Sequence, residues 1–192
     1  MKTVIEPAVP ALMLVGAFYA IAGVMAMRAV LSTRLIDVAT AAIGGKRPAH
    51  RETLQHIWLL ISSLIIFVGG IALLLRMELA AALFAISAAL QILYLLIAAP
   101  NYFDVLDPPD PKGRAATINA SVLYGAATLF VLWAYARGLL FPLEHLPPLL
   151  VALAGVVALA TVVYAGRRFV WGVGQGENAD RAEYRTQNHE DE

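Results

Sequence analysis

Charged residues divide the chain into five long uncharged segments. Each segment is 21 to 25 residues long, bounded by Glu6 and Arg28, Glu52 and Arg76, Glu78 and Asp104, Arg114 and Arg137, and Glu144 and Arg167. A helix needs about 20 apolar residues to cross the hydrocarbon core of a bilayer. In lipid, a backbone satisfies its hydrogen bonds only as a helix or in a closed barrel, and the short alternating segments of a barrel are missing from the sequence. The pattern therefore predicts five transmembrane helices, near residues 8–28, 56–76, 78–99, 116–137 and 146–166.

A shorter amphipathic stretch, LSTRLIDVATAAIGG, separates the first two predicted spans. With helical spacing its apolar and polar residues fall on opposite faces. The apolar face carries Leu31, Leu35, Val38 and Ala42, and the polar face carries Thr33, Arg34, Asp37 and Thr40. Two interpretations remain open. Residues 30–43 form a separate helix that lies at the lipid headgroups, or they continue the first span into the cytoplasm.

Composition strengthens the membrane assignment. Hydrophobic residues make up 60% of the chain and charged residues 15%, and the mean hydropathy is +0.71. So little polar surface cannot coat a soluble domain of this size. We therefore expect an all-α integral membrane bundle over residues 1–171. The polar remainder, residues 172–192, is expected to be a disordered cytoplasmic tail or one that a partner orders.

The distribution of positive charge predicts the orientation. Three of the fourteen Lys and Arg residues, Lys2, Arg76 and Arg137, fall on one side of the predicted membrane. The other side carries Arg28, Arg34, Lys46, Arg47, Arg51, Lys112, Arg114, Arg167, Arg168, Arg181 and Arg185. Because positively charged loops stay in the cytoplasm, the N-terminus is predicted outside and the C-terminus inside. A bacterial inner membrane is the expected location.

Several kinds of chemistry are disfavoured by the residues present. The chain has no cysteine, so it has neither thiolate nor Cys-ligated metal centres. No charged residue lies well inside a span, although proton relays and ion-coupled transporters need such groups there. The net charge is zero and no basic patch interleaved with aromatic residues suggests nucleic acid. We expect no catalytic residue, no cofactor and no metal.

Two groups of residues suggest a chemical function by their residue types, but their positions do not support one. Asp104, Asp107 and Asp110 could hold Mg²⁺ on one helical face, but the adjacent Pro108 and Pro109 interrupt a helix. The stretch 110–113 instead fits a type I turn. His56 and His145 could ligate one haem, but the predicted topology puts them on opposite sides of the membrane.

Mild polarity remains at mid-depth in the spans, and small residues recur every three or four positions. The mid-depth residues, which could line a cavity or form interhelical hydrogen bonds, are Tyr19, Ser62, Ser63, Gln91 and Thr128. The small residues, which let helix backbones approach, include Gly16, Ala20 and Gly23, Gly69 and Gly70, and Ser121 and Gly125. Arg34, Lys46, Arg47 and Arg51 are candidate contacts with lipid headgroups.

Interaction is the leading functional hypothesis. We expect a non-catalytic multi-pass protein that serves as an accessory or assembly subunit of a larger membrane complex, or that packs as a homo-oligomer. Its partners would be the lipid bilayer and other membrane subunits or itself. The alternative is a channel or permease for a small uncharged or lipophilic substrate. A weaker third hypothesis is an interfacial enzyme that uses His50, His56 and the loop aspartates.

Overall fold

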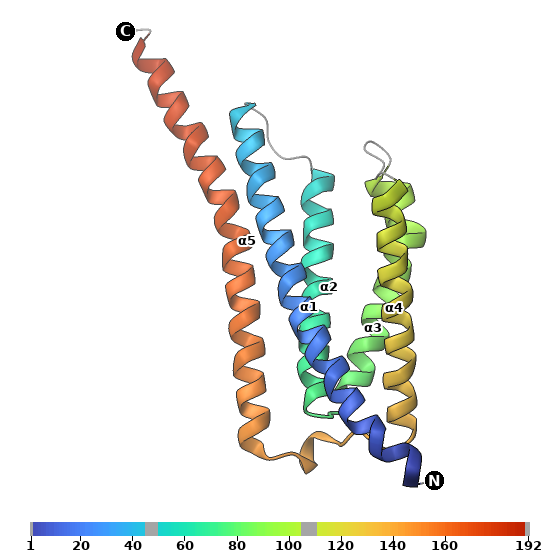
Figure 1. Ribbon diagram of the computed structural model, residues 1–192. Coiled ribbons are helices and arrows are strands. Elements are labelled where there is room, and N and C mark those ends of the chain that lie inside the picture. The colour runs from blue at the N-terminus through green and yellow to red at the C-terminus, as the bar shows by residue number, and fades with distance from the viewer. Residues whose placement is uncertain (1, 45–49, 105–110, 191–192) are drawn as a thin grey trace.

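The computed structural model describes residues 2–44, 50–104 and 111–190, with the backbone alone for residues 2–6, 42 and 171–190. Long helices follow one another in alternating directions (Figure 1). They are α1 (Lys2–Ile43), α2 (His50–Leu74), α3 (Leu79–Leu93) with the π-helix η1 (Tyr94–Phe103), α4 (Pro111–Ala136) and α5 (Pro148–Glu190), and a short 3₁₀ helix, η2 (Leu143–His145), precedes α5.

The predicted all-α bundle of five spans is confirmed. Within the described residues, five helical segments are long and apolar enough to cross a membrane: Pro7–Ala41, His50–Leu74, Leu79–Phe103, Pro111–Ala136 and Pro148–Val170. The third segment is longer than predicted because η1 continues α3 past residue 99, with Pro100 inside it. A proline cannot donate the usual helical hydrogen bond, and a π-turn accommodates such an interruption.

The first helix settles the choice between the two interpretations of residues 30–43. Helix α1 continues unbroken from Lys2 to Ile43, so this stretch extends the first span. Two of its hydroxyl groups bond to the helix itself. Ser32 Oγ donates to the Arg28 carbonyl at 2.8 Å, and Thr40 Oγ1 donates to the Ile36 carbonyl at 2.9 Å. The polar face therefore does not interrupt the helix.

The polar tail, expected to be disordered or ordered by a partner, continues the last helix. Helix α5 continues through Glu190 and extends past the ends of the neighbouring helices (Figure 1). Helical hydrogen bonds join residues within the same segment, so a polar stretch can continue a helix without contacting a core. The prediction that this segment takes its order from a partner stays a prediction.

Helices α1 and α2 form the closest pair in the bundle, and glycines make that approach possible. A Cβ atom added to Gly16 would lie 2.8 Å from the Leu74 backbone nitrogen, and one added to Gly23 would lie 2.7 Å from the Phe67 backbone nitrogen. Gly70 of α2 packs equally closely against the backbone of α1. The small-residue interface predicted for Gly16, Gly23 and Gly70 is present here. Gly125 of α4, by contrast, has nothing within 4 Å of where its Cβ would be.

We call the end of the bundle with the α2–α3 connection and η2 the outer end, and the end where α2 and α4 begin the inner end, following the charge prediction. At the outer end, Arg76 has a left-handed backbone with φ of 54°. Its carbonyl accepts a 2.6 Å hydrogen bond from the Phe141 amide, and its guanidinium donates to the Leu139 carbonyl at 2.8 and 3.1 Å. The connection that follows α4 is thereby fixed to the α2–α3 hairpin.

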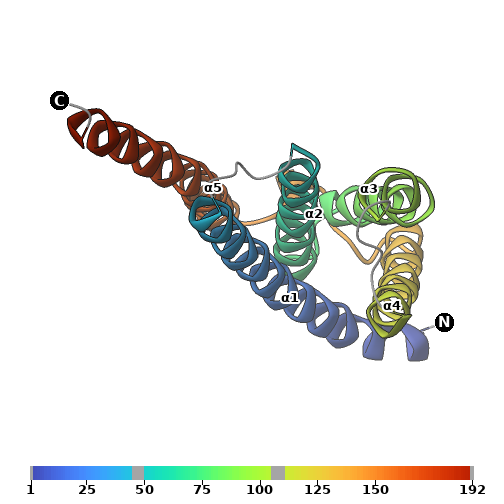
Figure 2. The same ribbon diagram turned by 90° about the horizontal axis from the view of Figure 1, so that it is seen from above.

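The helices separate toward the inner end. On α4, Tyr124, Thr128 and Val131 are all buried, whereas Ser121 is half-buried and Thr117 is exposed, although these residues share one helical face. Helices α1 and α4 lie close together near the N-terminus of α1 and far apart at the inner end (Figure 1). Seen from above, α1 and α2 lie between α5 and the α3–α4 pair (Figure 2). The main core is therefore in the outer half.

Candidate functional site

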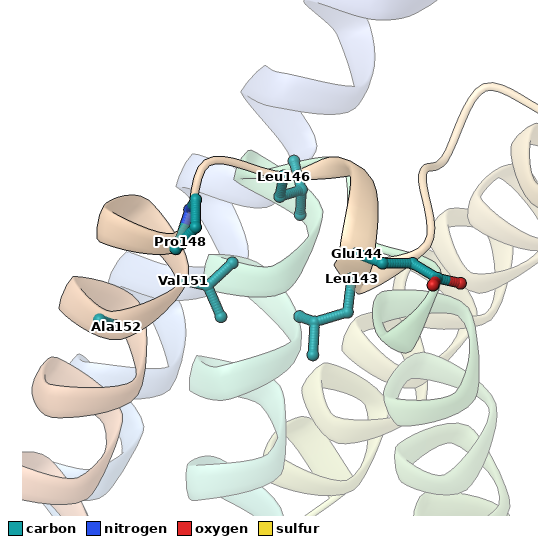
Figure 3. A pocket seen from close by; sticks show the side chains of 6 residues that line it. All are labelled: Leu143, Glu144, Leu146, Pro148, Val151 and Ala152. Carbon is teal, nitrogen blue, oxygen red and sulfur yellow. The ribbon is translucent and has the colours of Figure 1, made fainter.

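A shallow depression of about 620 Å³ lies between η2 and the first turns of α5. It is lined by Leu143, Glu144, Leu146, Pro148, Val151 and Ala152. In Figure 3 the Leu143 and Val151 side chains point into the space between them, and the Glu144 carboxylate points away from it. Apart from Glu144 the lining is apolar and open, so it offers surface for a hydrocarbon chain or another helix.

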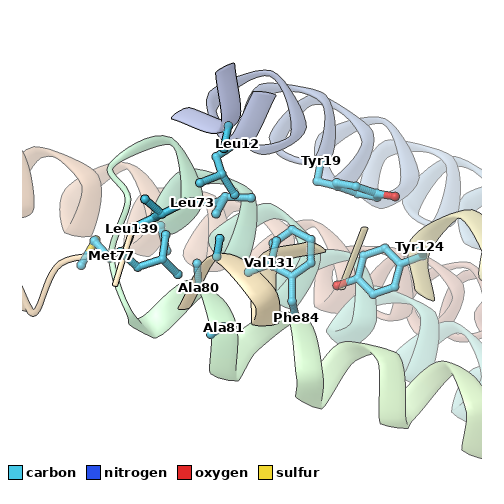
Figure 4. Packing of buried hydrophobic residues seen from close by; sticks show 14 residues of the cluster. Leu12, Tyr19, Leu73, Met77, Ala80, Ala81, Phe84, Tyr124, Val131 and Leu139 are labelled. Carbon is cyan, nitrogen blue, oxygen red and sulfur yellow. The ribbon is translucent and has the colours of Figure 1, made fainter. Parts of the chain in front are cut away.

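Three aromatic rings meet where the helices begin to separate toward the inner end. Tyr19 of α1 makes edge contacts with Phe84 of α3 and Tyr124 of α4, with ring centroids 5.5 and 5.0 Å apart. The Phe84 and Tyr124 rings stack with centroids 5.5 Å apart. All three side chains are buried (Figure 4). We call these residues the three-ring cluster; it joins α1, α3 and α4 and closes the bundle at this depth.

Two hydroxyl groups are buried beside this cluster without a well-formed hydrogen bond. Ser87 of α3 is fully buried and its hydroxyl interacts with that of Tyr124. Neither oxygen makes a hydrogen bond of good geometry with any group that the structure describes. Thr128 lies one turn from Tyr124, and its Oγ1 donates to the Tyr124 carbonyl at 2.9 Å. The cluster thus places hydroxyl groups in the middle of an apolar span.

The facing sides of α2 and α3 carry the remaining mid-depth polarity. Gln55 Nε2 donates to Tyr94 Oη at 3.1 Å, and Gly69, two heptads along α2, packs against Phe84. These two contacts fix the antiparallel register of α2 and α3. In this register Ser62 and Gln91 lie at similar depth, between the Gln55–Tyr94 and Gly69–Phe84 contacts. Both residues are half-buried. No hydrogen bond of the Gln91 side chain is found among the described residues, so its amide is open to a further partner.

The predicted mid-depth residues are only partly brought together. Tyr19 belongs to the three-ring cluster and Thr128 adjoins it, while Ser62 and Gln91 lie toward the inner end. Ser63 is buried elsewhere on α2, where its Oγ donates to the Leu60 carbonyl at 2.8 Å. The sequence interpretation missed Phe84, Ser87 and Tyr124. Their helical spacing, Phe84–Ser87–Gln91 on α3 and Tyr124–Thr128 on α4, is the signal that could have found them.

Charged residues at the inner end pair with one another. His56 Nε2 lies 3.3 Å from Asp37 Oδ2, and His56 Nδ1 lies 2.8 Å from the Glu52 carbonyl oxygen. Asp104 Oδ2 lies 3.3 Å from Arg114 Nη2. Asp37 and Asp104 therefore each have a cationic or imidazole neighbour instead of a metal-binding arrangement.

The other residues considered for metal, haem or catalysis are two aspartates and two histidines. Asp107 and Asp110 are outside the described residues. Pro111, Lys112 and Gly113 form the first turn of α4, where proline is favoured, so α4 begins within the predicted turn at 110–113. His145 lies in η2 at the outer end and His50 begins α2 at the inner end. The described residues contain no group of three His, Asp or Glu side chains that could hold a metal ion.

The candidate headgroup residues have different surroundings. Arg34 is buried at the junction of α1 with α5, and its guanidinium carbon lies 3.4 Å from the centroid of the Phe169 ring. Arg51 is exposed and lies over the Tyr102 ring of η1 at 5.0 Å. Lys46 and Arg47 are outside the described residues. Contact of these residues with lipid stays a prediction.

No protein-family model, curated protein or solved structure matches this chain significantly. The geometry of the molecule itself therefore carries the functional argument.

Proposed function

We propose that this multi-pass membrane protein is an accessory or assembly subunit of a larger complex in a bacterial inner membrane. The observation that carries the proposal is the sparse packing of α5. Ala165 is the one buried residue among the α5 side chains that the structure describes, Pro148–Val170. In the most apolar stretch of α5, 6% of the residues are buried, compared with 39% in α2.

One face of α5 has the composition of a helix–helix interface. Val151, Ala154, Ala158 and Thr161 share the face that carries Ala165, but they are half-buried where Ala165 is fully buried. Small residues four apart let another helix backbone approach closely, and in lipid such close packing drives association. Gly155, beside this face, has nothing within 4 Å of where its Cβ would be. A partner helix along this face supplies the contacts that the bundle leaves unmade.

The absence of cysteine makes a direct test simple. A single cysteine replacing Ala158, labelled with a photoreactive maleimide in native membranes, should crosslink to a protein after illumination. Val163→Cys, on an exposed position of the same helix, is the matched control and should crosslink mainly to lipid. Extraction in mild detergent should then recover the crosslinked partner together with this protein in a fixed stoichiometry.

The identity of the crosslinked protein distinguishes the forms of the proposal. A foreign polypeptide supports the accessory or assembly role, and a second copy of this chain supports the packed homo-oligomer. If Ala158→Cys behaves like Val163→Cys and the protein migrates as a monomer in mild detergent, the proposal is wrong.

A second candidate function, passage of a small uncharged or lipophilic substrate, rests on the inner-half polarity. Three polar residues are half-buried between the three-ring cluster, which closes the space between the helices, and the inner end. They are Gln91, Ser62 and Ser121. Purified protein in liposomes should then carry a neutral solute such as glycerol faster than protein-free liposomes. Replacing Gln91 by leucine should alter the rate without changing protein incorporation. No flux above the lipid background would exclude this function for the solute tested.

A further inference from the structure

Arg34 is a buried cation at the inner end. Its side chain comes from α1, and the residue is 6% exposed. The guanidinium stacks on Phe169 of α5 beside an apolar cluster made by Met27, Leu31, Leu60 and Ala165, to which Phe169 itself belongs. This cluster is also where α5 is held to the bundle. Arg34 thus lies where α1, α2 and α5 meet.

The charge of Arg34 is not matched by the described residues. None of their carboxylates forms an ion pair with it, because Asp37, one turn further along α1, pairs with His56. Its Nε is buried and makes no hydrogen bond. Stacking on Phe169 stabilises the cation through the ring but uses none of the five N–H donors of the guanidinium. A buried guanidinium without an acceptor is costly, so an anion is expected to complete the site.

The depth of Arg34 indicates which anion is at hand. The uncharged run of α1 ends at Arg28, and a helical rise of 1.5 Å per residue places Arg34 about 9 Å further toward the inner end. That distance passes from the hydrocarbon core into the headgroup layer. Arg167 and Arg168, which precede Phe169 on α5, are exposed and add positive charge to the same region. Phosphate is the anion that this layer supplies, and the guanidinium fork matches phosphate oxygens.

We propose that Arg34 and the adjoining turn of α5 form a phosphate-binding site, occupied by the headgroup of an anionic phospholipid from the inner leaflet. The phosphate accepts hydrogen bonds from the Arg34 guanidinium, and the half-buried Val30, one turn before Arg34 at the edge of this cluster, contacts a lipid chain. The site would also strengthen the attachment of α5, because the ligand contacts α1 and α5 together. This inference does not depend on the proposed subunit role.

The test uses purified full-length protein in neutral detergent and phosphate-free buffer. Phosphatidylglycerol, phosphatidylcholine and inorganic phosphate are added separately, and native mass spectrometry counts bound molecules while thermal unfolding is followed. The parent should retain phosphatidylglycerol selectively and unfold at higher temperature with it. Arg34→Gln should bind it about tenfold or more weakly, because a charge-assisted hydrogen bond is lost. Arg28→Gln, which changes an exposed arginine on the same helix, should match the parent.

Each outcome decides the proposal. Equal retention of phosphatidylglycerol by the parent and Arg34→Gln overturns it, as does a parent that responds to no phosphate compound. If inorganic phosphate alone stabilises the parent as much as the lipid does, and fails to stabilise Arg34→Gln, the phosphate site stands and its ligand is a soluble anion. If Arg34→Gln does not fold, Arg34→Lys is used instead. It keeps the positive charge but loses the guanidinium fork, so it should bind phosphatidylglycerol more weakly than the parent does, and binding equal to that of the parent would contradict the assigned role of Arg34.

Discussion

His56 Nε2 lies 3.3 Å from Asp37 Oδ2 and joins the start of α2 to the last part of α1. The other ring nitrogen faces the Glu52 carbonyl oxygen at 2.8 Å. Both ring nitrogens of His56 therefore face oxygen atoms. His56, which the sequence analysis considered as a haem ligand, thus links α1 to α2.

Asp37→Asn should weaken this connection only slightly. The Asp37 side chain is 38% exposed, so the expected loss in unfolding free energy is below about 1 kcal/mol. Thermal unfolding in detergent at low and high salt measures it. The difference between parent and variant should shrink as salt rises. A large loss that is insensitive to salt would mean that Asp37 supports the helix junction by something other than this ion pair.

Gly23→Ala should destabilise the bundle. The added Cβ would lie 2.7 Å from the Phe67 backbone nitrogen, so α1 and α2 must move apart, with an expected cost of about 1–3 kcal/mol. Gly125→Ala is the matched control, since nothing lies within 4 Å of the new atom and alanine favours a helix. Chemical unfolding in mixed micelles compares the two. Equal stabilities would show that the α1–α2 contact is looser than described.

Tyr124→Phe should leave the three-ring cluster intact. The ring contacts with Tyr19 and Phe84 do not need the hydroxyl, and the removed oxygen makes no well-formed hydrogen bond. The expected change in unfolding free energy is within about 1 kcal/mol. Tyr124→Ala removes a buried ring and should cost about 3–5 kcal/mol. Melting temperatures of both variants provide the comparison, and a Tyr124→Phe protein as unstable as Tyr124→Ala would point to an essential hydroxyl contact.

Gln91→Leu tests where the mid-depth amide finds its partner. The Gln91 side chain makes no hydrogen bond with the described residues, so the isolated monomer should keep its stability within about 0.5 kcal/mol. Gln55→Leu, which breaks the hydrogen bond to Tyr94, should cost about 1 kcal/mol and serves as the comparison. Melting temperature and complex size are measured together. Loss of the complex with unchanged monomer stability places Gln91 at a subunit contact.

The orientation prediction is tested with single cysteines in the cysteine-free chain. Ser32→Cys, near the inner end, should be protected from an impermeant thiol reagent in intact cells. Leu143→Cys, which replaces an exposed residue at the outer end, should be labelled. The reverse labelling pattern would place η2 in the cytoplasm and remove the basis for an inner-leaflet ligand at Arg34.

The sequence by itself determined the class of fold and the number of spans. In lipid each backbone segment must satisfy its hydrogen bonds internally, so an uncharged run of sufficient length becomes a helix whatever surrounds it. The close approach at Gly16, Gly23 and Gly70 could also be predicted from the sequence, because small residues at helical spacing leave room for a neighbouring backbone. These properties are local, and a local pattern reports them.

The tertiary structure decided which helices meet and where they separate. The sequence of residues 30–43 suits an interfacial helix and a longer span equally well. The structure shows the longer span, because α1 is continuous and Asp37 lies beside His56. The three-ring cluster draws single residues from three helices, so the helical spacing within α3 and α4 indicates which face each ring lies on but not which rings meet. The charge of Arg34 predicts contact with lipid headgroups, which stays a prediction, whereas its burial against Phe169 arises from the approach of α5 and could not be predicted from the sequence. Contacts between apolar helices depend on shape over residues far apart in the chain, and lipid can cover the same faces, so hydrophobic pattern alone does not select among the packings.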